Sequence, residues 1–301
     1  MKIIFFGTPD FALPSLDFLN KSKHEIVAVV TAPDKERGRG RKVSYTPIKE
    51  YAIENNLKCL QPEKMKDESF IESLQELEAD LFVIVAFRIL PRSVFTIPKH
   101  GSFNLHGSLL PKYRGAAPIH WAIMNGDKKT GVTTFFLEDK VDTGNMISQS
   151  EMEIEEEDNL GTVHDKMSLL GADLVLETVN EIDSGNVELQ KQNNDLASPA
   201  PKISKELGKI DWDKPAEKIH NLVRGLSPFP SAYFIHNAKK YKIFKSRIIS
   251  DLRLNPGELK ETKNEVFVGT SKDAIQILEL QLEGRKRMNV DAFLRGYSFK
   301  K

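Results

Sequence analysis

The hydrophobic positions near the start of the chain form short unbroken runs separated by a helical stripe. One apolar run covers Lys2–Phe6 and a second covers Glu25–Thr31. The stripe between them follows Pro9, a residue that favours the first turn of a helix. Strand, helix and strand in this order make a βαβ unit, which predicts a parallel sheet. The residues of the stripe are Phe11, Leu13, Leu16 and Leu19.

Further strands and helices extend this α/β pattern. Leu81–Ala86 is continuous, apolar and rich in β-branched residues, which is typical of a central parallel strand buried on both faces. Phe103–His106 and Val132–Leu137 also have the character of strands. The remaining periodic segments predict helices at 47–55 and 67–77 and a long amphipathic helix at 161–182 that covers the sheet.

From Lys205 onward the pattern changes to short strands separated by turns. Residues 229–234, 242–244, 265–269 and 274–282 alternate or run apolar, and residues 216–226 predict a helix. Several short strands with turn breaks indicate a small β-barrel. The polar stretch before this part, with Pro199 and Pro201, predicts a linker.

Composition limits the class of protein. The chain has 301 residues, of which 40% are hydrophobic and 29% charged, which is typical of a globular protein with two domains. No run of 18 apolar residues occurs, so we expect no membrane span, and the N-terminal apolar run is too short for a signal peptide. The single cysteine, Cys59, excludes an intramolecular disulfide and a cysteine-based zinc site, so we expect a reducing, cytoplasmic location.

The zero net charge conceals an asymmetry. Residues 1–204 hold 23 lysines and arginines against 31 aspartates and glutamates, whereas residues 205–301 hold 20 against 12. A basic part that follows an acidic part indicates either a polyanionic partner or simply a basic solvated surface. Charge alone does not identify the ligand.

The segment Ala32–Thr46 is predicted to be a long loop in which basic residues alternate with glycines. Arginine is well suited to phosphate contacts, and glycine lets the backbone follow an RNA surface. We favour RNA contact over a purely solubilising role, because loops of this length usually carry function. The basic residues assigned to this contact are Arg37, Arg39, Arg41 and Lys42.

Candidate chemistry is concentrated between residues 101 and 142. Asn104 and His106 are two residues apart, so on a strand their side chains point to the same face. Asp142 follows the next strand-like run and is expected to meet His106 in space. An amide donor, an imidazole and a carboxylate at strand ends suit acyl transfer through a charged tetrahedral intermediate.

Four motifs carry a family resemblance. Asn104–Pro111, with the sequence NLHGSLLP, and Val141–Gly144, with VDTG, resemble the signature of the folate-dependent formyltransferases. Arg114–Ile119, with RGAAPI, and Gly7–Ala12, with GTPDFA, narrow the resemblance to the branch that formylates methionyl-tRNA. The resemblance implies a Rossmann-like catalytic domain at 1–189, a linker at 190–204 and an OB-like tRNA-binding domain at 205–301.

The resemblance also implies the substrates and the site residues. It implies 10-formyltetrahydrofolate as the formyl donor, the α-amino group of initiator methionyl-tRNA as the acceptor, and a monomeric enzyme without a metal. In this family the basic loop approaches the acceptor end of the tRNA. The implied catalytic residues are Asn104, His106 and Asp142, and the implied folate contacts are Ser108, Leu109, Leu110, Pro111, Arg88, Ile89 and Leu90.

Three rival interpretations differ in testable features. Formyl transfer to a small amine, such as glycinamide ribonucleotide or an amino sugar, is opposed by the basic loop and the basic C-terminal part. An RNA-binding protein with an inactive catalytic domain is opposed by the intact Asn104, His106 and Asp142. A nicotinamide dehydrogenase would require a triple-glycine fingerprint, which Gly7-Thr8-Pro9 does not supply.

Overall fold

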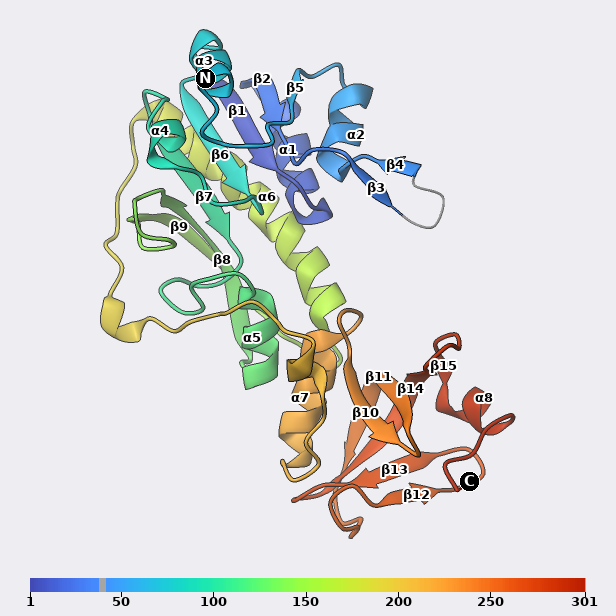
Figure 1. Cartoon of the computed structure of the whole chain (residues 1–301). Helices are drawn as coiled ribbons and strands as arrows, with labels where there is room; N and C mark the ends of the chain where they lie inside the picture. Colours follow the sequence, from blue (N-terminus) through green and yellow to red (C-terminus); the bar gives the residue numbers. More distant parts are fainter. Residues whose placement is uncertain (38–41, 301) are drawn as a thin grey trace. The chain divides into compact units, whose positions relative to one another are not determined.

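The computed structural model describes residues 1–37 and 42–300, and the chain divides into two compact units (Figure 1). Each unit is assembled from three segments of the chain rather than from one continuous stretch. Unit 1 comprises Met1–Pro118, Thr130–Met152 and His164–Ala200. Unit 2 comprises Ile119–Lys129, Glu153–Val163 and Pro201–Lys301.

A seven-stranded sheet forms the centre of unit 1, with the strand order β5-β2-β1-β6-β7-β8-β9. Neighbouring strands from β5 to β7 are parallel, and β8 runs antiparallel to β7. The parallel sheet predicted from the apolar runs is confirmed. The strands are β1 (Lys2–Gly7), β2 (Glu25–Val30), β5 (Cys59–Leu60), β6 (Leu81–Val85), β7 (Ser102–His106), β8 (Lys129–Phe136) and β9 (Met146–Glu153).

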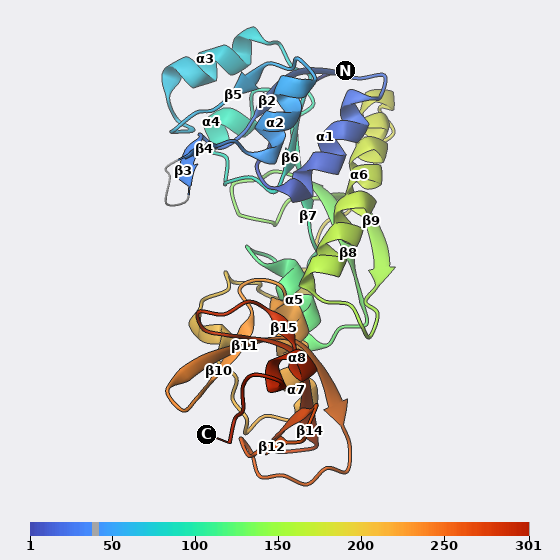
Figure 2. The same cartoon turned by 90° about the vertical axis from the view of Figure 1, so that its right-hand side faces the viewer.

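Helices cover both faces of this sheet, which makes unit 1 a Rossmann-like α/β domain (Figure 2). On one face, Ile4 and Phe6 of β1 pack with Phe70 of α3 in a buried apolar cluster. On the other face, Gly171 of α6 lies so close to Leu105 of β7 that a β-carbon would stand 2.5 Å from its Cδ2 atom. The helices are η1 (Asp10–Ala12), α1 (Leu13–Asn20), α2 (Pro47–Glu54), α3 (Glu68–Glu76), α4 (Arg92–Phe95) and α6 (Leu160–Ser184).

The segment predicted as a loop at 32–46 is partly a hairpin, so that prediction was wrong for its flanks. Strands β3 (Lys35–Arg37) and β4 (Lys42–Ser44) pair antiparallel, with Arg37 opposite Lys42. Backbone hydrogen bonds between two strands need no apolar side chains, so a polar composition did not exclude pairing. Arg39 and Arg41 lie outside the described residues.

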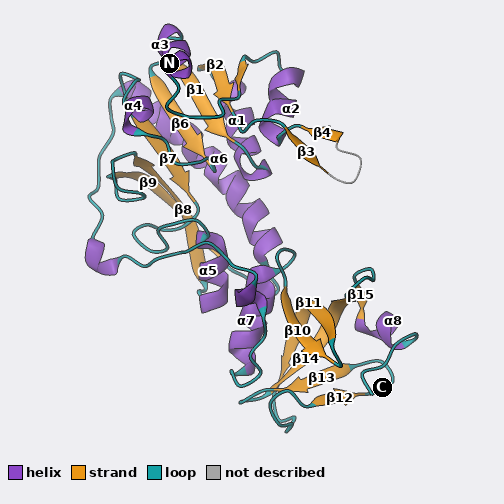
Figure 3. Ribbon diagram, viewed as in Figure 1, coloured by secondary structure: helices purple, strands orange, loops and turns teal. Residues whose placement is uncertain are grey.

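Unit 2 contains an open, curled antiparallel sheet, an OB-like half-barrel, in the order β10-β11-β14-β13-β12, with β15 beside β14 (Figure 3). Strand β11 turns Tyr241 and Ile243 into the core, where Tyr241 stacks on Phe234 with ring centroids 5.2 Å apart. The OB-like architecture implied by the resemblance is thereby confirmed. The strands are β10 (Ala232–His236), β11 (Lys239–Ile249), β12 (Leu259–Glu261), β13 (Val266–Gly269), β14 (Ala274–Leu282) and β15 (Met288–Asn289), and the helices are α5 (Pro118–Asn125), η3 (Glu206–Gly208), α7 (Ala216–Leu226) and α8 (Val290–Leu294).

The stretch predicted to be a linker has definite contacts within unit 1. Gln190 pairs with Met146, and Pro199 pairs with Arg114 through backbone bridges. A single helical turn, η2 (Asn194–Leu196), lies between these two bridges. Within the described part of the chain, no helix combines the length and apolar character that crossing a bilayer requires.

Candidate active site

His106 is the last residue of β7, and its ring is fixed by the backbone. Its Nε2–H donates to the carbonyl oxygen of Tyr113 at 2.8 Å, and the side chain is 6% exposed. Burial lowers the pKa of His106 below its ordinary value, although the Asp142 carboxylate and the Tyr113 carbonyl oppose that shift. The neutral ring therefore keeps its proton on Nε2 and presents an unprotonated Nδ1.

Asp142 lies opposite that nitrogen, in the turn after β8. Its Oδ2 atom is 3.9 Å from Nδ1 of His106 and accepts a hydrogen bond from the backbone N–H of Gly115 at 2.8 Å. Asp142 has φ +55°, in the left-handed region that aspartate adopts more readily than most other non-glycine residues. The carboxylate is thus fixed by Gly115 and acts on His106 through its charge.

Asn104 shares the strand face of His106, two positions earlier. The intervening residue, Leu105, faces α6, so Asn104 and His106 point to the opposite face of the sheet. Among the residues that the structure describes, none hydrogen-bonds to the Asn104 side-chain amide. A half-buried amide beside a histidine is therefore available to donate to an external oxygen.

The loop after His106 is held in place by two polar side chains of the neighbouring strands. Thr133 donates to the carbonyl of Ser108 at 2.7 Å and accepts from the N–H of Leu110 at 3.1 Å. Gln149 donates to the carbonyl of Leu110 at 2.9 Å. These contacts fix the backbone that follows β7, and no periodic pattern in the sequence marks the two side chains that make them.

The four residues predicted to contact folate in this loop are placed differently from one another. The Ser108 hydroxyl is fully buried and donates to the carbonyl of Lys112 at 2.6 Å. Leu110 is buried in a small cluster with Phe135 and Met146. Leu109 and Pro111 are half-buried. Ser108 and Leu110 therefore shape the loop from inside.

A cavity of about 460 Å³ lies at the carboxyl ends of β1, β2 and β6. This volume is in the range of small-molecule sites, and the carboxyl edge of a parallel sheet is where α/β proteins bind ligands. The lining residues include the polar Thr8, Lys35 and Arg88 and the aromatic Phe87. The lining residues are Thr8, Pro9, Ala32, Pro33, Lys35, Ala86, Phe87 and Arg88.

The segment after β6 supplies one wall of this cavity. Arg88 lines the cavity, and its guanidinium donates to the carbonyls of Glu63, at 2.9 Å, and Pro62. Ile89 is 74% exposed, whereas Leu90 is buried in the core beneath α4. Only Arg88 of these three predicted folate residues therefore faces the cavity.

The residues predicted to contact RNA are only partly placed. Arg37 ends β3 and Lys42 begins β4, and the two pair across the hairpin. Within unit 2, β11 alternates its inward Tyr241 and Ile243 with Lys240 and Lys242 on the other face.

Among the described residues, no cluster of three or more histidine, cysteine, aspartate or glutamate side chains could hold a metal ion.

Comparisons with known proteins agree with this architecture along almost the whole chain. The profile described as "Formyl transferase" matches residues 1–179, and that described as "Formyl transferase, C-terminal domain" matches residues 202–298. The chain is 47% identical to the methionyl-tRNA formyltransferase of Flavobacterium johnsoniae, over 99% of this chain and 97% of that protein. It is 44% identical to the methionyl-tRNA formyltransferase of Caldanaerobacter subterraneus subsp. tengcongensis, over 99% and 97%.

A solved structure has the same fold at lower identity. The sugar 3N-formyl transferase WlaRD, crystallised in the presence of dTDP and 5-N-formyl-THF, superposes with a TM-score of 0.70 at 23% identity. The superposition covers 95% of this chain and 99% of that one.

Proposed function

Because this chain belongs to the formyl transferase family, we propose that it moves a formyl group from 10-formyltetrahydrofolate to the α-amino group of initiator methionyl-tRNA. The relatives that carry the name methionyl-tRNA formyltransferase match 99% of the chain at 44% and 47% identity. A structural neighbour was crystallised in the presence of 5-N-formyl-THF, which supports a folate as the formyl donor.

The observation that carries the proposal is the position of Asn104, His106 and Asp142 around the end of β7. The amine nitrogen attacks the formyl carbon, and the carbonyl electron pair moves onto oxygen. No described residue hydrogen-bonds to the Asn104 amide, so it is available to donate to that oxyanion. An amide makes this donation without changing its own protonation state. Losing one such donor costs about 3 kcal/mol of transition-state stabilisation.

His106 accepts the proton that the amine loses, and Asp142 stabilises the protonated ring. The ordinary pKa of an α-amino group is about 8, so near neutral pH a modest shift yields the free base. The unprotonated Nδ1 of His106 takes the amine proton, and the resulting imidazolium is stabilised by the Asp142 carboxylate 3.9 Å away. The C–N bond to the folate then breaks, and the proton passes to the departing nitrogen.

We propose that the folate meets backbone groups more than side chains. The guanidinium of Arg88 is committed to the carbonyls of Glu63 and Pro62, so it braces the segment that continues through Ile89 and Leu90. The buried Ser108 and Leu110 likewise shape the loop that carries Leu109 and Pro111. The 460 Å³ cavity beside Phe87 has room for a reactant at this edge of the sheet.

The tRNA would be held by two basic surfaces. One is the basic stretch of the sequence that contains Arg37, Arg39, Arg41 and Lys42, and the other is the part at 205–301, where basic residues exceed acidic ones. In this proposal residues 1–189 are catalytic, 190–204 connect, and 205–301 bind tRNA. The enzyme acts as a monomer in the cytoplasm.

A formylation assay tests the proposal directly. Purified protein, 10-formyltetrahydrofolate and methionyl-tRNA should yield N-formylmethionyl-tRNA. Uncharged tRNA, glycinamide ribonucleotide and a nucleotide-linked amino sugar serve as competing acceptors in parallel reactions. Formylation of a small amine with no reaction on methionyl-tRNA would replace the proposed acceptor, and no turnover on any amine would remove the enzymatic assignment.

A further inference from the structure

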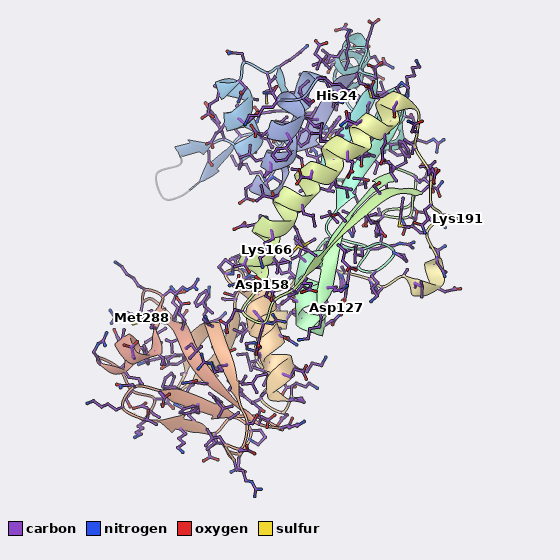
Figure 4. All side chains as sticks on the ribbon, turned by 180° about the vertical axis from the view of Figure 1, so that it is seen from behind. His24, Asp127, Asp158, Lys166, Lys191 and Met288 are labelled. Carbon is purple, nitrogen blue, oxygen red and sulfur yellow. The ribbon has the colours of Figure 1, made fainter. Side chains whose placement is uncertain are left out.

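The segment after Gln190 contains one buried amide between exposed neighbours. Gln192 is 5% exposed, whereas Lys191 and Asn193 on either side are exposed. Lys191 projects outward from this segment (Figure 4). A polar side chain that is buried in an otherwise solvated stretch needs partners for all its donors and acceptors.

Gln192 finds those partners around the turn that carries Asp142. Its Nε2 donates to the carbonyl of Asp142 at 3.0 Å and to the carbonyl of Gly144 at 2.8 Å. Its Oε1 accepts from Nε of Arg114 at 3.0 Å and from Nη2 of Arg114 at 2.6 Å. Two donated and two accepted hydrogen bonds use the full capacity of a glutamine amide.

Arg114 is itself fixed and therefore serves as an anchor. Its Nη2 also donates to Oδ1 of Asn194 at 2.9 Å. Its backbone N–H donates to the carbonyl of Ser198 at 2.8 Å, and its carbonyl accepts from Ala200 at 2.6 Å. The guanidinium thus connects the segment after Gln190 to the loop that follows β7.

The same loop holds the other end of Asp142. Gly115, the next residue after Arg114, donates its N–H to the Asp142 carboxylate. Gly144 can belong to this turn only because it lacks a side chain, since a β-carbon would stand 1.7 Å from the carbonyl oxygen of Phe136. Gln192 therefore holds the backbone carbonyl of Asp142, and Gly115 holds its carboxylate.

We propose that Gln192, anchored by Arg114, is a positioning residue that holds the Asp142–Gly144 turn so that the Asp142 carboxylate faces His106. The inference rests on the proposed function for its catalytic consequence, but the geometry it describes exists without substrate. It also gives Arg114 a definite role inside the protein.

The primary test replaces Gln192 by methionine, which has a similar length and cannot donate to the two carbonyls. Gln192→Met should lower kcat for formylation by at least about tenfold, which is about 1.4 kcal/mol in activation free energy. The KM for methionyl-tRNA and the Kd for folate should stay within about twofold, because the four hydrogen bonds that the substitution removes position Asp142 for the chemical step. The exposed neighbour supplies the control, since Lys191→Met should behave as the wild type does.

A double-mutant cycle separates positioning from general destabilisation. If Gln192 acts through Asp142, adding Gln192→Met to Asp142→Asn should lower kcat little beyond the single Asp142→Asn change. Additive losses in this cycle would overturn the proposal. If Gln192→Met does not fold, Arg114→Lys takes its place. Lysine keeps the positive charge, but it lacks the planar guanidinium that makes two hydrogen bonds to the Gln192 amide oxygen.

A titration that needs no turnover keeps this inference separate from the proposed function. The Asp142 carboxylate raises the pKa of His106, so displacing it should move the NMR titration of that ring to lower pH in Gln192→Met. His106→Asn identifies the signal. An unchanged His106 titration would overturn the positioning role even if the wild type formylates methionyl-tRNA. A shifted titration in a protein without formylation activity would leave the positioning intact and reject the proposed function.

Discussion

The Nδ1 nitrogen of His106 lies 3.9 Å from Oδ2 of Asp142, an ion-pair distance that is too long for a hydrogen bond. The ring is instead oriented by the Tyr113 carbonyl at its other nitrogen. The charge of Asp142 therefore becomes most important when His106 is protonated. The backbone carbonyl of Tyr113 thus sets the orientation of the ring, and the Asp142 carboxylate supplies a negative charge beside it.

Asp142→Asn should keep the contact with Gly115, because an amide oxygen can still accept that N–H, but it removes the negative charge. We expect the rate of formyl transfer in single-turnover reactions to fall by at least about a hundredfold. The pKa of His106 should also fall, because the carboxylate raises it in the wild type. A normal single-turnover rate would contradict the role assigned to this carboxylate.

His106→Asn should remove the imidazole that accepts the proton while keeping a polar side chain at this position. Turnover should fall by about a hundredfold or more, with folate affinity nearly unchanged. His100→Asn makes the same change at an exposed histidine just before β7 and should leave turnover as in the wild type. Retention of more than about a tenth of the wild-type kcat by His106→Asn would show that another group carries the proton.

The sequence predicted the strand that carries the site but not the groups that orient it. Alternation along β7 was sufficient to place Asn104 and His106 on one face. The carbonyl of Tyr113 and the N–H of Gly115 are backbone groups, which every residue has, so no residue type could mark them. Tertiary packing alone brings them to the histidine and the carboxylate.

Gln192 and the β3–β4 hairpin were missed for a related reason. A polar stretch with prolines has the composition of a linker, and one buried amide within it leaves that composition unchanged. The hairpin is held by backbone pairing between residues of which only Val43 is apolar, which gives no hydrophobic alternation to detect. Both features depend on hydrogen bonds rather than on buried apolar area.

A different histidine should make the stability of unit 2 depend on pH. Burial, and then the nearby Arg224 charge, lower the pKa of His220, while Glu157 and Glu156 oppose that shift. Below the ordinary histidine pKa of about 6.5, the unfolded chain then binds more protons than the folded chain. The free energy of unfolding should therefore decrease as the pH falls from about 7.5 to 5.5, because part of it is lost to protonation of the unfolded state.

Two substitutions should change that slope in opposite directions. His220→Gln removes the titrating group and should flatten the pH dependence, whereas Glu157→Gln removes a group that raises the pKa of His220 and should steepen it. Urea unfolding followed by tryptophan fluorescence measures both, since Trp121 and Trp212 lie in unit 2. Equal slopes in the wild type and in His220→Gln would show that this histidine contributes nothing to the pH dependence.

The last prediction concerns the basic hairpin and its proposed phosphate contacts. Each phosphate neutralised by a lysine or arginine releases condensed counterions, so affinity for methionyl-tRNA should fall steeply with salt. Changing Arg37 and Arg39 together to alanine should reduce the slope of log affinity against log salt by about one unit for each phosphate that is no longer neutralised. Lys64 and Lys66, exposed on the stretch before α3, give a control with the same change in charge. Their double alanine variant should keep the wild-type slope, and folate affinity should be unchanged in both variants. If the Arg37 and Arg39 variant keeps the wild-type salt slope and turnover, the hairpin is a solvated surface and the tRNA is held elsewhere.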